Sequence, residues 1–184
     1  MGNIEREFKT GITREKYYEL INELDLKDKS YLQTNYYFDT DDLELKKKEK
    51  TLRIRIKEIS IHLTLKEHVK DYTKETTINL TKEEASNYIK NGIDGNQYGI
   101  DKLLVNVSKL STKRTKLKTK YGMLFFDMNN YNNITDYEIE YEVDDKISTL
   151  DGLFEFNHFL KENGIPFVKL KSKSKRAIET RKWS

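Results

Sequence analysis

Several segments of the chain alternate strictly between apolar and charged side chains, and this alternation constrains the fold more than any other feature. From Leu52 to Lys57, aliphatic residues take turns with Arg53, Arg55 and Lys57. The segment 137–143 alternates in the same way, with glutamates as its charged members. Because successive side chains of a strand point to opposite faces, each segment predicts a strand with one apolar and one charged face.

The other patterns predict an α+β fold that is mostly β. Strands are expected at 4–9, 33–38, 51–58, 61–67, 73–80, 110–120, 123–128 and 137–143. Helices are expected after Thr13, after Thr81 and over 149–163, where apolar residues recur at helical spacing behind capping residues. Short turns between the strands favour antiparallel connections. The segment 92–99 is expected to be a loop, and the alternating lysines at 171–175 to be a solvated tail.

Length and composition limit the class of protein. The 184 residues contain no repeat and no linker, so one domain over 1–184 is expected. The chain has no cysteine, which excludes disulfides, thiolate zinc sites and a catalytic cysteine. Without a signal segment or a run of ~20 apolar residues, a cytoplasmic protein with no membrane partner is expected. The oligomeric state stays open, with a homodimer among the alternatives.

A lysine-rich run at 46–50 is the one segment that suggests nucleic-acid binding. It follows an acidic stretch at 39–44, and the net charge of the chain is only +3. These features favour a solvated turn, so no nucleic-acid partner is expected.

The charged faces need a partner if the strands lie side by side. Neighbouring like charges destabilise a sheet, although a sheet with one wet face would show the same alternation. Phosphate oxygens neutralise Arg and Lys, and a divalent metal neutralises carboxylates, so a phosphate ligand carrying Mg²⁺ satisfies both kinds of row. If the sheet closes into a barrel, eight strands suffice to enclose such a ligand.

The motif E-x-E-x-K, formed by Glu5, Glu7 and Lys9, resembles the signature of the CYTH family, also called triphosphate tunnel metalloenzymes. Further segments resemble that family in the same order along the chain. They are 35–40, 52–55, 64–66, Glu75, Arg114, Asp127, 138–140 and 172–175. The sequence is most similar to the bacterial YjbK-like branch.

The resemblance implies a closed, tunnel-like barrel of eight antiparallel strands with helices packed outside. It also implies a hydrolase that depends on Mg²⁺ or Mn²⁺ and cleaves tripolyphosphate or an organic triphosphate, such as thiamine triphosphate or a nucleotide. Two alternatives remain. The protein could bind polyphosphate or a nucleotide without hydrolysis, or it could be a class IV adenylate cyclase.

The resemblance also assigns roles to residues of this sequence. The implied metal ligands are Glu5, Glu7, Asp127, Glu138 and Glu140. The implied phosphate-binding residues are Lys9, Arg53, Arg55, Lys66, Arg114, Lys116 and Lys173. The catalytic candidates are Glu138 or Glu75, which would orient the attacking water, and Arg53, which would stabilise charge on the leaving phosphate. Thr112 stands where some members of the family have a lysine, and Lys116 could compensate.

Overall fold

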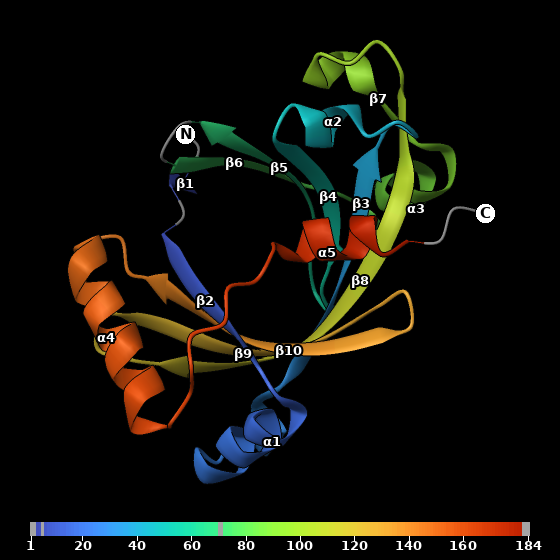
Figure 1. The fold of residues 1–184 in the computed structure, drawn as a ribbon. Helices are drawn as coiled ribbons and strands as arrows, with labels where there is room; N and C mark the ends of the chain where they lie inside the picture. Colours follow the sequence, from blue (N-terminus) through green and yellow to red (C-terminus); the bar gives the residue numbers. More distant parts are fainter. Residues whose placement is uncertain (1–2, 5, 70–71, 182–184) are drawn as a thin grey trace. The chain divides into compact units, whose positions relative to one another are not determined.

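The computed structural model describes residues 3–4, 6–69 and 72–181, which form two compact units (Figure 1). Within these residues, unit 1 consists of 3–4, 33–111 and the segment that starts at Ser172, and unit 2 consists of 6–32 and 112–171. Two strands cross the boundary between the units. The expectation of a single domain over 1–184 stays a prediction.

Unit 1 is built mainly from strands. Its elements are β1 (Asn3–Ile4), β3 (Tyr31–Asp39), α2 (Glu44–Lys47), β4 (Lys50–Ile56), β5 (Ile61–Val69), β6 (Tyr72–Asn79), α3 (Lys82–Asn91), β7 (Ile93–Asp94), the first half of β8 (Leu103–Lys118) and α5 (Lys173–Glu179). The strand order is β1-β6-β5-β4-β3-β8, with β7 paired to β8. Leu52, Ile54 and Leu63 lie on the buried face, together with Leu45 of α2 and Ala85 of α3.

Unit 2 continues from the second half of β8. Its other elements are β2 (Glu7–Ile12), α1 (Arg14–Glu23), β9 (Gly122–Tyr131), β10 (Ile134–Val143) and α4 (Thr149–Glu162). The strand order is β8-β9-β10-β2, and α1 and α4 pack on one face of this sheet (Figure 1). The core of the unit includes Tyr17 and Leu20 of α1, Ile139 and Tyr141 of β10, and Phe156 of α4. The opposite face of the sheet carries the charged side chains of the strands.

The predicted architecture of a mostly antiparallel sheet with helices is confirmed. The closed eight-stranded barrel is not confirmed, because the strand order among the described residues is open, from β1 to β2. The sheet has ten strands, of which β1 and β7 are only two residues long. Among the described residues, no helix combines the length and the apolar character that a membrane span requires.

Several boundaries differ from the expected ones for local reasons. β9 and β10 extend to a tight hairpin at Asn132 and Asn133, which both have positive φ angles, of 48° and 63°. Two central residues with positive φ suit the twist of a hairpin, and asparagine tolerates this conformation. The expected loop at 92–99 contains β7 and a 3₁₀ turn at Gly95–Tyr98, and β8 begins at Leu103.

The C-terminal segment is a packed helix and not the expected solvated tail. Ser172 caps α5, since its hydroxyl accepts a hydrogen bond from the backbone N–H of Lys175. Ala177 and Ile178 are buried, and Ser108 of β8 donates a hydrogen bond to the carbonyl of Ala177. The alternating lysines are therefore not on one side of a strand, because the helical period separates them.

Candidate functional site

The charged face of unit 2 contains a buried acidic cluster, made by Asp127 of β9 with Glu138 and Glu140 of β10. These residues are 0%, 0% and 6% exposed, and one oxygen of each lies within 4.8 Å of the others. Asp127 and Glu138 are direct partners in the strand register, and Glu140 is two residues further along the same face. Oxygen ligands at this spacing are the kind that Mg²⁺ and Mn²⁺ prefer.

Arg114 of β8 provides positive charge at this cluster. Its Nε donates a hydrogen bond to Asp127 Oδ1 at 2.8 Å, and its Nη2 donates to Asp127 Oδ2 at 2.6 Å and also to Glu140. Burial lowers the pKa of Arg114, but the charges of Asp127 and Glu140 outweigh burial and raise this pKa well above its usual value. The guanidinium is therefore a permanent cation in the cluster.

Lys9 and Glu7 of β2 border the same acidic residues. Lys9 lies opposite Glu140 in the register, and its Nζ donates to Glu7 Oε1 at 2.5 Å. Burial lowers the pKa of Lys9, whereas the charges of Glu7, Glu140 and Glu138 raise it, and the net result is a raised pKa. Lys9 is thus a cation at neutral pH, available to a phosphate oxygen as well as to Glu7.

Thr112 and Asn129 connect to the acidic cluster through buried hydrogen bonds. The hydroxyl of Thr112 donates to Asn129 Oδ1 at 2.7 Å, and Asn129 Nδ2 donates to Glu138 Oε1 at 3.1 Å and to Asp136 Oδ1 at 3.0 Å. Both residues are 0% exposed. Thr112 thus orients the side-chain amide of Asn129, which in turn donates to Glu138. Lys116, the expected substitute, is exposed on β8.

The polar face of unit 1 carries a second group of charges. Lys66 lies opposite Glu75 in the register, and Lys66 Nζ is 2.5 Å from Glu75 Oε1. Arg53 Nη2 is 3.6 Å from the same oxygen. The next arginine along β4, Arg55, donates from Nε to Asn35 Oδ1 at 2.9 Å. Glu75 therefore sits between two of the predicted phosphate-binding cations.

Buried polar atoms without a partner occur on this same face of unit 1. Gln33 is 1% exposed and Asn35 is 0% exposed, yet neither polar atom of the Gln33 side chain, nor Asn35 Nδ2, has a hydrogen-bond partner among the described residues. Arg53 Nε and His62 Nδ1 are also buried and have no hydrogen-bond partner among the described residues. Leaving such a group unsatisfied costs about 1–3 kcal/mol. A ligand with several acceptor atoms, such as a phosphate, would satisfy the three amide and guanidinium donors.

The predicted site residues therefore fall into two sets. Unit 2 brings together Glu7, Lys9, Arg114, Asp127, Glu138 and Glu140, and unit 1 brings together Arg53, Arg55, Lys66 and Glu75. Lys173 lies in the first turn of α5 in unit 1. Glu5 lies outside the described residues.

Sequence reasoning missed Gln33 and Asn129 as parts of these sets. Gln33 shares a strand face with Asn35, and Asn129 shares one with Asp127, two residues away in each case. Period-two alternation could have found both. They were missed because an uncharged amide on a strand carries no obvious chemistry until its neighbours across the sheet are known.

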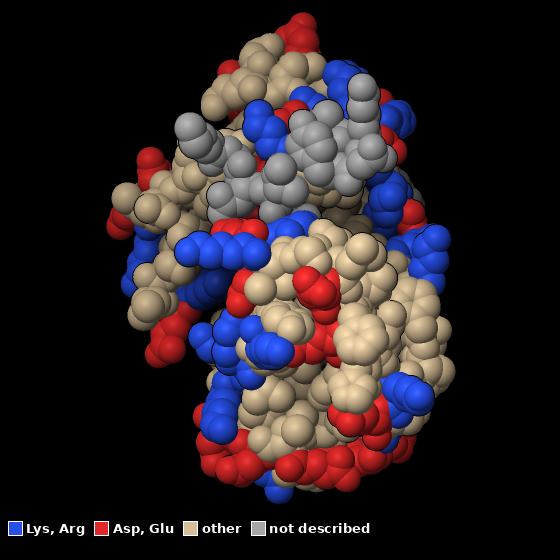
Figure 2. All heavy atoms as spheres, turned by 90° about the vertical axis from the view of Figure 1, so that its left-hand side faces the viewer, with Lys and Arg blue, Asp and Glu red and all other residues tan. Residues whose placement is uncertain are grey.

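On the face that Figure 2 presents, Lys and Arg side chains are interspersed with Asp and Glu side chains. The expectation that the protein has no nucleic-acid partner stays a prediction.

Comparison with known proteins gives a consistent family. The model of the CYTH domain matches residues 3–178. A Bacillus subtilis protein named "Putative triphosphatase YjbK" is 33% identical over 190 residues, which cover 98% of this chain and 97% of that protein. A crystal structure from Bacillus halodurans, described as a putative adenylate cyclase, is 32% identical with a TM-score of 0.85, over 95% of this chain and 97% of that one.

A more distant solved structure shares the fold. The protein HpAC1 from Hippeastrum is 20% identical with a TM-score of 0.68, over 98% of this chain and 96% of that one. It was described as a putative adenylyl cyclase with a dominant triphosphatase activity. At this identity the likeness concerns the fold alone.

Proposed function

Since the chain belongs to the CYTH family, we propose that it is a metal-dependent hydrolase that releases the terminal phosphate of tripolyphosphate or of an organic triphosphate. The observation that carries this proposal is the buried cluster of Asp127, Glu138 and Glu140 beside Arg114 and Lys9. Buried carboxylates are costly unless they are paired or coordinate a metal. A protein that only bound an anion would gain nothing from carboxylates at the same place.

The proposed metal site uses carboxylate oxygens. Glu7, Asp127, Glu138 and Glu140 would hold Mg²⁺ or Mn²⁺, with Glu5 as a further ligand from the E-x-E-x-K motif. Carboxylates are the usual protein ligands of Mg²⁺, which keeps several positions for water and phosphate oxygens. The bound ion would neutralise phosphate charge and polarise a phosphoryl oxygen.

Each unit has its own set of proposed phosphate-binding residues. The set in unit 1 is Arg53, Arg55 and Lys66, the set in unit 2 is Lys9 and Arg114, and each set would stabilise phosphate charge. Lys116 and Lys173 are further candidates. The unpartnered donors of Gln33, Asn35 and Arg53 support a polyanionic ligand in unit 1.

The proposed reaction is the in-line attack of water on the terminal phosphorus, which breaks the bond to the bridging oxygen. Glu138, whose Oε1 accepts a hydrogen bond from Asn129 at 3.1 Å, is one proposed candidate for orienting the water. Glu75, which contacts Lys66 and Arg53, is the other. Arg53 would stabilise the charge that develops on the leaving phosphate.

A class IV adenylate cyclase is the second candidate, because the Bacillus halodurans relative was described as a putative adenylate cyclase. Such an enzyme acts on a nucleoside triphosphate. A hydroxyl group of the nucleotide attacks the α-phosphorus of the same molecule, and diphosphate leaves. The products separate the two candidates, since a triphosphatase releases orthophosphate while a cyclase releases cyclic AMP and diphosphate.

The test is a panel of tripolyphosphate, thiamine triphosphate, ATP and longer polyphosphate, each with Mg²⁺ or Mn²⁺. We expect orthophosphate release that stops when a chelator removes the metal and falls strongly in Glu140→Gln. Glu23→Gln, an exposed change on α1, is the matched control and should keep wild-type turnover. If the protein binds these compounds but releases no product, it is a binding module and not a hydrolase. If it forms cyclic AMP from ATP, it is a cyclase.

A further inference from the structure

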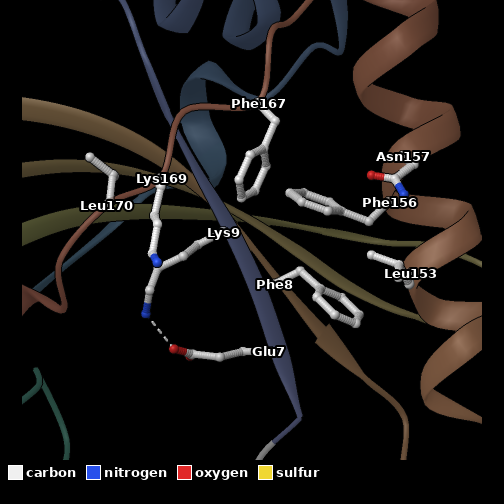
Figure 3. A pocket seen from close by; sticks show the side chains of 9 residues that line it. All are labelled: Glu7, Phe8, Lys9, Leu153, Phe156, Asn157, Phe167, Lys169 and Leu170. Atoms are coloured by element: carbon white, nitrogen blue, oxygen red, sulfur yellow. Dashed lines mark hydrogen bonds and ion pairs between the residues drawn. The ribbon is translucent and has the colours of Figure 1, made fainter.

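A pocket of about 230 Å³ opens in unit 2 between β2, α4 and the segment 166–170 that follows α4 (Figure 3). One part of its wall is apolar and is formed by Phe8, Leu153, Phe156 and Phe167. The other part contains Glu7 and two lysines, Lys9 and Lys169. We refer to it below as the Phe167 pocket.

Hydrogen bonds to β2 position the segment that forms one side of the pocket. The N–H of Gly11 donates to the carbonyl of Val168 at 3.1 Å, and the N–H of Val168 donates to the hydroxyl of Thr10 at 2.7 Å. The segment therefore follows the edge of β2, with Val168 attached to the strand. Phe167 and Lys169, one residue to either side of it, both line the pocket.

The apolar part has a fixed wall and an open wall. The rings of Phe8 and Phe156 stack with their centroids 6.1 Å apart, and Phe156 is 1% exposed. Phe167 is 65% exposed, and no other ring of the described residues stacks on it. Figure 3 shows its side chain pointing into the space toward Phe156. A flat ring packed against Phe167 would cover apolar surface that is now in contact with water.

The charged part lies where the proposed phosphate-binding residues begin. Figure 3 shows Lys9 and Lys169 extending toward the same end of the pocket, where Lys9 is bonded to Glu7. Lys169 is exposed, and it has no hydrogen-bond or ion-pair partner among the described residues. An apolar wall that ends in two ammonium groups is complementary to a flat apolar group attached to phosphate.

We propose that the Phe167 pocket binds an aromatic ring of an organic triphosphate, with Lys9 and Lys169 on the phosphate next to it, so that organic triphosphates are preferred to tripolyphosphate. This inference rests on the proposed function and names its substrate class. The volume of about 230 Å³ is below the ~300–1,000 Å³ of sites that enclose whole ligands, so the pocket accommodates one ring system.

The first test compares substrates. The values of kcat/KM for thiamine triphosphate, ATP and tripolyphosphate are measured with Mg²⁺ in Phe167→Ala and Lys169→Ala. The preference for an organic triphosphate over tripolyphosphate should fall by about three- to tenfold in Phe167→Ala, the range expected for one aromatic contact. In Lys169→Ala, kcat/KM should fall by about two- to fivefold for all three substrates, as for an exposed charge pair, because each of them presents a phosphate to this lysine.

The controls are matched by residue type and exposure. Phe154→Ala removes a phenylalanine of α4 that is 75% exposed and does not line the pocket, and Lys161→Ala removes an exposed lysine of the same helix. Both should keep the wild-type kcat/KM values and the wild-type preference. Equal losses for all substrates in Phe167→Ala, or no change, would overturn the inference, and so would a wild-type protein that cleaves tripolyphosphate but neither organic substrate.

A second test does not depend on turnover. Calorimetry without metal measures the binding of thiamine monophosphate and AMP to wild type, Phe167→Ala and Phe154→Ala. We expect saturable binding that weakens about three- to tenfold in Phe167→Ala only. If no substrate is hydrolysed but this binding is present, the proposed function fails while the pocket assignment stands. Absence of binding for both probes overturns the assignment.

Discussion

On the two charged faces, the hydrogen-bond and ion-pair partners of a residue indicate which role it can have. Arg53 contacts Glu75 through Nη2 at 3.6 Å, while its Nε has no partner among the described residues. Thr112, in contrast, is an uncharged residue that acts on Glu138 only through Asn129. The first residue is therefore proposed to touch substrate, and the second is proposed to position a group that does.

Replacing Arg53 by alanine should lower turnover severely. By analogy with the removal of one preorganised donor from a site that stabilises developing charge, we expect kcat with tripolyphosphate to fall by about 10²- to 10³-fold. Steady-state kinetics with Mg²⁺ measures this effect, with Lys74→Ala, an exposed change on β6 in the same sheet, as the control. Wild-type hydrolysis by Arg53→Ala would contradict the assignment.

Replacing Thr112 by valine tests the hydrogen bonds that hold Glu138. Valine keeps the shape but removes the donor to Asn129, so the amide loses its fixed orientation, and a small misplacement of a catalytic group can lower turnover by up to about 10²-fold. We expect kcat to fall while KM changes little. Because an unsatisfied buried group costs about 1–3 kcal/mol, the free energy of unfolding should fall as well.

The conservative variant separates positioning from general damage. Thr112→Ser keeps the hydroxyl and should retain kcat, although it removes a buried methyl group. If Thr112→Ser and Thr112→Val lose the same kcat, or if Thr112→Val affects only stability, Thr112 has no positioning role.

At the scale of elements, the Glu155 side chain attaches α4 to the β8–β9 turn. Glu155 accepts hydrogen bonds from the backbone N–H groups of Lys120 and Tyr121, and from the hydroxyls of Thr119 and Tyr141. Burial raises the pKa of Glu155, but these hydrogen bonds lower it, and the net result is a pKa below the ordinary 4.5. The ionised carboxylate thus stabilises the folded unit.

Stability should depend on pH through Glu155. Because its pKa is lower in the folded state than in the unfolded one, its contribution is present above about pH 4.5 and is lost as the pH falls through the folded pKa. Glu155→Gln removes the charge and replaces one of the two accepting oxygens by an NH₂ donor, so one backbone N–H group loses its acceptor, which should cost about 1–2 kcal/mol at neutral pH. Urea unfolding at a series of pH values should show the two proteins converging in acid. A gap that stays constant with pH would contradict this role.

The helices also show which elements sequence patterns can predict and which they cannot. The helices after Thr13 and Thr81 were predicted from their caps, and the structure has both side-chain hydrogen bonds. The short helix α2 and the helix α5 were not predicted. Their apolar residues, such as Leu45 and Ile178, become recognisable as buried only when the sheet of unit 1 is present to cover them. Segments this short are not stable by themselves.

At the scale of the whole molecule, both signs of charge are abundant while the net charge is only +3. The described structure sorts these charges by sheet face, with the buried carboxylates concentrated in unit 2. An excess of acid at one place is a preferred site for a divalent ion, and an ion that binds only the folded state stabilises it.

Mg²⁺ should therefore raise the temperature of unfolding. At about 100 times its dissociation constant, a ligand specific for the folded state adds about 2.7 kcal/mol. Calorimetric scans with and without Mg²⁺ measure this for wild type and for Glu138→Gln, with Glu23→Gln as the control. The stabilisation should disappear in Glu138→Gln alone. If Mg²⁺ does not raise the unfolding temperature of the wild-type protein, the proposed metal site is wrong, and so is the proposed hydrolase.

The sequence by itself determined the strands, their charged and apolar faces, the main helix caps and the resemblance to the CYTH family, because alternation, capping and motifs depend on residues close together in the chain. The sequence did not determine which charged side chains contact one another. Arg114 contacts Asp127 and Glu140 only because three strands align in one register, and Gln33 and Asn129 matter only through neighbours across the sheet. The Phe167 pocket likewise depends on a segment that follows α4 returning to the edge of β2. Such contacts join residues far apart in the chain, and only tertiary packing decides them.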